Sequence, residues 1–150
     1  MASDIVPASV IRAIDSLTAN EFVVELDGER LSGIFRVTGL IPFKLDARTS
    51  SAPKPVREPF KISKMVQRDP NSPFNRWLRE TTAAKADIAR PTRTLDVIAV
   101  DGGVETRRWT IKDAWISEIA YSDFDSGSGE LVQEIVTVQW AEAEESWLGE

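Results

Sequence analysis

The sequence of 150 residues contains no cysteine and no histidine. Without cysteine the chain has no thiol nucleophile, no thiolate metal ligand and no disulfide. Without histidine it lacks the imidazole that acts as general base in Ser-His catalysis and that most zinc sites use as a ligand. Only hydroxyl, amine and carboxylate chemistry remains, so we expect neither an enzyme nor a bound cofactor or metal.

Long hydrophobic runs are missing as well. The N-terminal stretch MASDIVPASVIRAID is interrupted by Asp4, Arg12 and Asp15, so it fits neither a signal peptide nor a membrane span, and we expect no membrane anchor. The 18 basic and 24 acidic side chains give a net charge of −6. An acidic chain is poorly suited to neutralise phosphates, which predicts no stable nucleic-acid binding.

Alternating apolar and polar residues predict strands joined in hairpins. In EFVVELD the apolar face holds Phe22, Val24 and Leu26. Asp27-Gly28 follows as a hairpin signal, because both residue types tolerate positive φ. The partner strand RLSGIFRVTGL would then carry one apolar face formed by Leu31, Phe35 and Val37.

Two more hairpins are predicted in the second half of the chain. TLDVIAV and ETRRWTI flank the turn Asp101-Gly102-Gly103, and AWISEIAY and ELVQEIVTVQW flank the Gly/Ser-rich segment SDFDSGSG. About six strands arranged in hairpins indicate a mainly β protein with one or two short helices. We expect an antiparallel β-sandwich or barrel with a flanking helix.

One short helix is predicted within NSPFNRWLRET. Ser72 is a suitable N-cap, and Pro73 occupies the first helical position, where no backbone N–H is needed. The apolar stripe at i, i+3, i+4 and i+7 comprises Phe74, Trp77, Leu78 and Thr81. This stripe predicts packing against the sheet, with the charged residues in solvent.

Three segments frame the organisation of the chain. Residues 1–19 are expected to form an N-terminal arm or short helix, residues 20–141 the β domain, and residues 142–150 an acidic C-terminal tail. Residues 44–61 are Pro-rich and net basic and are expected to form a long loop. That loop is either a solvated insertion or a docking arm that becomes ordered on a neighbour.

Carboxylate pairs are the remaining candidates for catalysis. Asp123 and Asp125 lie in a turn where Asp is favoured for local hydrogen bonds, and Glu142, Glu144 and Glu145 lie in the expected tail. Neither group is expected to be catalytic. By elimination, the sequence indicates a binding or assembly protein.

Four motifs in a fixed order resemble the tail tube protein family of contractile phages and phage-like contractile injection systems. The resemblance extends over residues 20–140, and the motifs are Thr38-Gly39-Leu40 after a strand, the Trp77-Leu78 pair in a short helix, the strand WTIKDAW from Trp109 to Trp115, and Gln133-Glu134-Ile135 opening a strand after an acidic turn. The segment SAPKPVREPF departs from the family pattern because it lacks the usual Gly-containing turn.

The resemblance implies a tail tube-like β-sandwich or barrel that forms hexameric rings, which stack into a hollow tube driven into a target by sheath contraction. The implied partners are other copies of the chain, a sheath protein, baseplate and spike proteins, and DNA or protein cargo passing through the lumen. Assembly in the bacterial cytoplasm into a virion tail or injection particle is implied too. On charge and expected exposure, we predict subunit contacts at Arg48, Lys54, Arg57, Arg107 and Glu134.

Several alternatives stay open at this stage. A baseplate tube adaptor of the same machinery would share the motifs, although a chain of this length without an extra domain favours the polymerising subunit. A tube protein of a non-contractile tail, or a secreted ring-forming tube protein of related fold, would share the hairpins, but the spacing of WTIKDAW argues against it. A small β-barrel enzyme or ligand-binding protein would require a pocket with convergent polar groups, which the sequence does not indicate.

Overall fold

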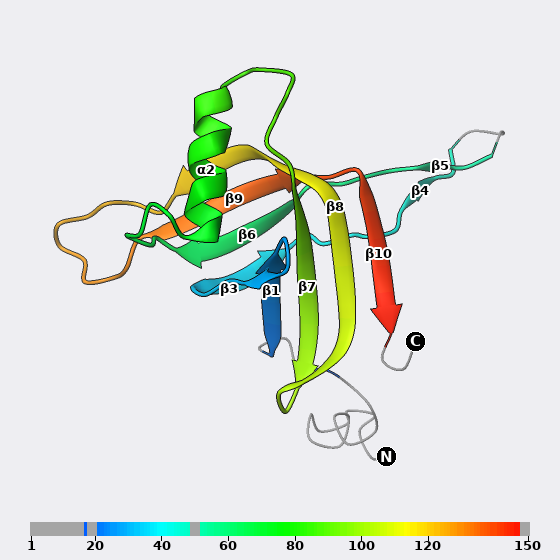
Figure 1. The fold of residues 1–150 in the computed structure, drawn as a ribbon, viewed down its shortest axis with the longest axis horizontal. Helices are drawn as coiled ribbons and strands as arrows, with labels where there is room; N and C mark the ends of the chain where they lie inside the picture. Colours follow the sequence, from blue (N-terminus) through cyan, green and yellow to red (C-terminus); the bar gives the residue numbers. More distant parts are fainter. Residues whose placement is uncertain (1–16, 18–20, 49–51, 148–150) are drawn as a thin grey trace, which may run out of the picture.

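The computed structural model describes residue 17 and residues 21–48 and 52–147. One antiparallel sheet of eight strands has the order β2-β1-β7-β8-β9-β6-β3, with β10 as a further partner of β8, and a separate two-stranded ribbon joins β4 to β5. The elements are β1 (Phe22–Leu26), β2 (Glu29–Arg30), β3 (Ile34–Thr38), β4 (Leu45–Asp46), β5 (Lys54–Pro55), β6 (Phe60–Met65), α2 (Pro73–Ala84), β7 (Arg93–Asp101), β8 (Val104–Tyr121), β9 (Gln133–Gln139) and β10 (Glu142–Trp147). The mainly β architecture with a flanking helix is confirmed (Figure 1).

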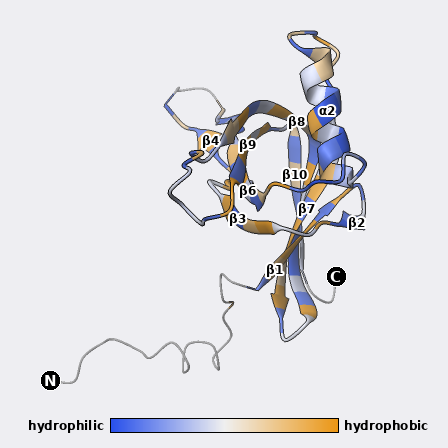
Figure 2. Ribbon diagram, turned by 90° about the vertical axis from the view of Figure 1, so that its left-hand side faces the viewer, coloured by the Kyte–Doolittle hydropathy of each residue, from blue (hydrophilic) through white to orange (hydrophobic). Residues whose placement is uncertain are grey.

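The two ends of the sheet are joined by a short connection. β2 and β3 stand at opposite ends of the strand order, yet only residues 31–33 separate them in the chain. Gly33 makes the change of direction with φ of 84°, a conformation that glycine adopts without steric cost. The view in Figure 2 shows the strands arranged around an interior, with α2 at one side.

This change of direction differs from the expected continuous strand over residues 30–40. β2 ends at Arg30, and β3 pairs with β6 instead of continuing along β1. A register shift between Ile34 and Arg36 places Ile34 instead of Phe35 on the core face, while Leu31 and Val37 keep the expected side. Ile34 and Val37 pack against the core, whereas Phe35 is exposed.

A shared bend divides the sheet into two halves. β8 is one strand of 18 residues and not the two strands expected from the sequence, and Asp113 has a φ of 53° within it. β9 and β10 pair along the same side of β8, and their ladder is interrupted between the rungs Trp115–Gln139 and Lys112–Glu142. We call β2, β1, β7, residues 104–114 of β8 and β10 half A, and residues 115–121 of β8 with β9, β6 and β3 half B.

The C-terminal segment is therefore a strand and not the tail expected over residues 142–150. Residues Glu142–Trp147 form β10 and pair with residues 107–112 of β8. Residues 148–150 and all of the expected N-terminal arm except Leu17 lie outside the described residues. The segment 44–61 is not a simple loop either, because β4 and β5 pair within it and β6 begins at Phe60.

Helix α2 has the predicted start and the predicted buried face. Ser72 stands at the N-cap with Pro73 following, although its side chain makes no capping hydrogen bond. Phe74, Trp77 and Leu78 are buried in the core shared with both halves of the sheet. The Trp77 indole donates to the Pro91 carbonyl at 3.1 Å, which fixes the helix to the segment leading into β7. Along the described residues, no helix is long and apolar enough to span a membrane.

The core contains an ion pair between Lys64 on β6 and Glu134 on β9. The side chains are 0% and 5% exposed, and Lys64 Nζ lies 2.8 Å from Glu134 Oε1. The ammonium also donates to the Met65 carbonyl at 2.9 Å and lies 5.1 Å from the centre of the Phe74 ring. Both charges are thus compensated inside half B, where an unpaired charge would be costly.

We predict strong coupling between these two residues. Lys64→Met alone leaves the Glu134 carboxylate without its buried partner, and we expect it to lower the free energy of unfolding by about 3–5 kcal/mol. The double variant Lys64→Met with Glu134→Leu removes both charges and should be much closer to the parent protein. Urea denaturation of the single and double variants measures the coupling, and additive losses would contradict it.

Candidate functional site

Strand edges are the first feature that a partner could use. Among the described strands, β3 pairs only with β6, β10 pairs only with β8, and residues 115–121 of β8 pair only with β9. Each such edge presents backbone N–H and C=O groups on its open side. Half A and half B therefore both end in edges to which another strand can be added.

The second feature is the ribbon of β4 and β5, which projects away from the sheet (Figure 1). The Val56 amide donates to the Lys44 carbonyl at 2.8 Å and closes its base. Arg57 donates from Nε to the Ala141 carbonyl, so the ribbon is fastened to the bend between β9 and β10. The ribbon is thus held where it leaves the sheet.

Two cations of the ribbon are paired within it. Arg48 is 89% exposed but bonds to Asp46 at 3.0 Å, and this contact holds the pKa of Asp46 below its usual value. Lys44 pairs with Glu58 at 2.9 Å. Lys54 is exposed, and within the described part of the chain it has no carboxylate partner. Of the three predicted contact residues here, Arg48 is paired with Asp46 and Arg57 is bound to the Ala141 carbonyl, whereas Lys54 has neither kind of contact.

Arg107 lies in a cluster that fastens β10 to β8. Its guanidinium lies 3.6 Å from the centre of the Trp147 ring, its cross-strand neighbour. Trp109, on the same face, donates from Nε1 to Glu145 at 2.7 Å, and Lys112 pairs with Glu144 at 2.7 Å. The prediction of a solvated acidic tail at the C-terminus is therefore wrong, because local sequence does not reveal the pairing of this segment with β8.

Glu134 does not lie on the surface. It was predicted as a contact residue on the premise that it is exposed, but its carboxylate is buried against Lys64. The single Tyr residue of the chain, Tyr121, is the cross-strand neighbour of Glu134 on β8. Alternation along β9 would have placed Glu134 with Val136 and Val138 on the core face, and this signal was overlooked.

An apolar and acidic surface lies where β8 turns into β9. Large hydrophobic side chains are exposed there, namely Val66, Tyr121, Phe124 and Leu131. They border a groove of about 300 Å³. The adjoining turn contributes the carboxylates of Asp123, Asp125 and Glu130. We call residues 121–131 together with Val66 the turn surface.

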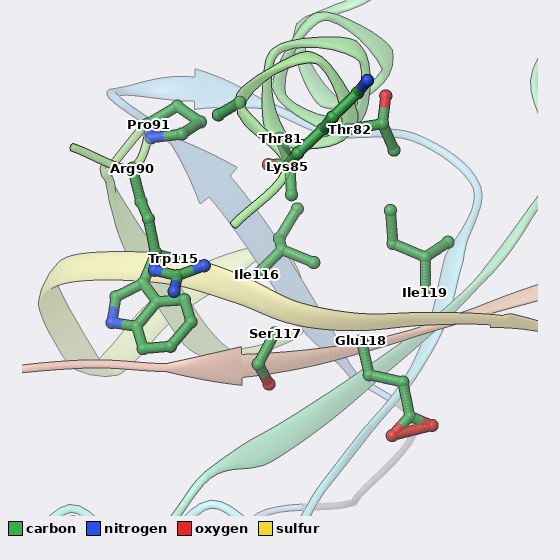
Figure 3. A pocket seen from close by; sticks show the side chains of 11 residues that line it. Thr81, Thr82, Lys85, Arg90, Pro91, Trp115, Ile116, Ser117, Glu118 and Ile119 are labelled. Atoms are coloured by element: carbon green, nitrogen blue, oxygen red, sulfur yellow. The ribbon is translucent and has the colours of Figure 1, made fainter. Parts of the chain in front are cut away.

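A further pocket of about 320 Å³ lies between the end of α2 and the open edge of β8 (Figure 3). Arg90 lies over the Trp115 ring at 4.6 Å from its centre, and Ile116 and Ile119 point toward the helix. Thr81 Oγ1 is buried there without a hydrogen-bond partner. The Ser117 hydroxyl in its lining contacts the Thr137 carbonyl and the Gln139 amide and not Lys85 or Glu118, and the residues that the structure describes hold no cluster suited to a metal ion.

Three of the five acidic groups considered for catalysis, Asp125, Glu144 and Glu145, have local structural roles. Asp125 accepts hydrogen bonds from the amide of Gly127 through its carboxylate and from the amide of Ser128 through its carbonyl, as expected for a turn. Glu144 and Glu145 are bound to Lys112 and Trp109. These contacts explain the carboxylates as parts of the fold.

The fold is that of the tube proteins of contractile injection systems and of Hcp tube proteins. A chain of the sheath-tube complex of PVC, an extracellular contractile injection system, in its extended state superimposes with a TM-score of 0.71 at 12% identity, covering 95% of this chain and 99% of that chain. A chain of the anti-feeding prophage baseplate gives 0.60 at 10% identity, with coverages of 90% and 98%. Hcp1 from Flavobacterium johnsoniae gives 0.54 at 10% identity, with coverages of 85% and 95%.

No protein-family model matches the sequence, and no curated protein is similar to it in sequence. The likeness is therefore one of fold.

The environment of Tyr121 leads to a prediction. Tyr121 is 51% exposed, and desolvation of the part that is covered, followed by the neighbouring Glu134 carboxylate, raises the pKa of the phenol above its usual value of 10.0. The folded state therefore favours the neutral phenol, so this contribution to stability is complete below the unfolded pKa and is lost as pH rises through the folded pKa.

Because the chain has one tyrosine, its ultraviolet absorbance titration reports this group alone. We expect the midpoint of the folded protein to lie above that of the urea-unfolded protein. Equal midpoints in the two states would show that neither the partial desolvation of Tyr121 nor the Glu134 carboxylate shifts the pKa in solution.

Proposed function

We propose that this chain, which has the fold of contractile injection system tube proteins, is a structural subunit that forms hexameric rings stacked into a hollow tube. The observation that carries the proposal is the likeness to a chain of the sheath-tube complex over nearly the full length of both chains. An isolated motif would not produce such mutual coverage. The role is structural and not enzymatic.

The open strand edges support self-assembly on physical grounds. A long exposed edge favours uncontrolled pairing with other chains, and closed symmetric rings remove that hazard by pairing each edge with the next subunit. The edges of β3, β10 and the second part of β8 provide such surfaces. Ring formation would satisfy backbone groups that a monomer leaves to water.

The partners follow from the proposed role. A tube of this kind would lie inside a contractile sheath, start from a baseplate and carry a spike, and DNA or protein cargo would pass through its lumen. The acidic balance of the chain, with net charge −6, would limit adhesion of nucleic acid to the tube. Assembly would take place in the bacterial cytoplasm, and the product would be a phage tail or an injection particle.

A baseplate adaptor is the second candidate, and one observation favours it. A chain from a baseplate shares the fold with coverages as high as 90% and 98%. An adaptor would start a tube without extending it. Only one face of its ring would need to bind a further ring. The two roles differ in whether the protein alone forms stacks.

Expression of the chain alone followed by native mass spectrometry and negative-stain microscopy tests the proposal. We expect hexamers and stacked hollow tubes that lengthen as protein concentration rises. Hexamers that never stack would favour the adaptor. A monomer at every concentration would contradict self-assembly, and a search for a small molecule bound in the pocket beside α2 would follow.

A further inference from the structure

The ribbon and the turn surface lie at opposite ends of the molecule. In Figure 1, drawn with the longest axis horizontal, β4 and β5 project at one extremity and the connection from β8 to β9 projects at the other. The two surfaces therefore cannot meet within one copy. They can meet between copies that follow one another head to tail.

The charges of the two surfaces are complementary. The described part of the ribbon carries four cations, Lys44, Arg48, Lys54 and Arg57, against the two carboxylates of Asp46 and Glu58. Residues 121–131 contain three carboxylates and no basic residue. Arg68, at the rim of the groove, is the one cation among the residues that line it, so the surface keeps a negative balance.

Both surfaces carry charges that have no ion-pair partner within the described residues. Within the part of the chain that the structure describes, the Lys54 ammonium has no carboxylate partner. The carboxylates of Asp123 and Glu130 are likewise without a cation among the described residues. Such unmatched charges steer the approach of a complementary surface and fix its register.

Exposed apolar side chains accompany the charges on both surfaces. Phe43 and Leu45, at the base of the ribbon, are 78% and 43% exposed. On the turn surface Phe124 and Leu131 are 80% and 69% exposed and border the groove. Apolar residues this exposed beside unmatched charges are typical of an interaction site, because contact removes their surface from water.

We propose that the ribbon of one copy docks on the turn surface of the next copy, with Lys54 facing Asp123 and Glu130 and the apolar groove receiving the ribbon. A second copy is the partner because both complementary surfaces belong to this chain. The contact is heterologous because it joins two different surfaces, so its repetition builds an open stack. Closure of each ring would depend on pairing of the strand edges. This inference rests on the proposed tube function and specifies which surface receives the ribbon.

The absence of cysteine allows the contact to be tested directly, because introduced thiols are the only ones present. Copies carrying Lys54→Cys and copies carrying Asp123→Cys are mixed, assembled and oxidised, and the disulfides are identified by peptide mass spectrometry. We expect a link between positions 54 and 123 that depends on assembly. The matched control is Asp87→Cys, at an exposed carboxylate outside both surfaces, which should give no such link.

Charge reversal provides the second arm. Lys54→Glu should at least halve the length of the stacks seen by microscopy while single rings persist, and Asp123→Lys in the same chain should restore the length. Stacks of normal length in Lys54→Glu, or a link from position 54 to position 87 instead of 123, would overturn the docking proposal and leave the tube function intact. Absence of rings in the parent protein would instead refute the tube function.

Discussion

The shared bend of β8 and of the β9–β10 pair is the constraint on which the structure depends. Both strands change direction between the same two rungs of their ladder, at Asp113 on one strand and near Ala141 on the other. The Trp140 indole donates to the Glu58 carbonyl at 2.7 Å, and Arg57 bonds to Ala141, so the bend also anchors the ribbon. One local feature thus creates two sheet halves and sets where the ribbon leaves them.

The fold separates charges that are satisfied internally from charges left for a partner. Arg108 contacts Asp96 on β7, Glu25 on β1 and Glu105 on its own strand, and the contact with Arg108 lowers the pKa of Glu105. Lys64 and Glu134 compensate one another in the core. By contrast, Lys54 at one end and Asp123 at the other have no described partner. An acidic protein with these localised mismatches is suited to ordered association with itself.

Local signals predicted most of the elements. Proline at the helix start, the stripe of Phe74, Trp77 and Leu78, and the Asp-Gly and Gly-Gly turns depend on neighbouring residues only, and the structure confirms all of them. The bend at Asp113 was missed because a single non-glycine residue at positive φ leaves no periodic signal. β10 was not predicted because its carboxylates bind Lys112, Arg107 and Trp109, which lie on β8 and far from β10 in the sequence.

The predicted contact residues likewise divide into those whose surroundings follow from neighbouring residues and those whose surroundings depend on distant parts of the chain. Exposure of Lys54 could be predicted from its polar, proline-rich surroundings, whereas burial of Glu134 depends on Lys64, which lies 70 residues away in the chain. Phe124 and Leu131 had no role in the sequence-based prediction, because exposure of an apolar residue in a turn depends on what the rest of the chain leaves uncovered.

The central claim is that assembly closes the open strand edges, and amide hydrogen exchange read by mass spectrometry tests it most directly. Exchange along β3, β10 and residues 115–121 of β8 would be compared between dilute and concentrated protein. The account predicts slower exchange at one or more of these edges in the concentrated sample, with core strand β7 unchanged. Equal exchange at all three edges in samples that differ in assembly would contradict it.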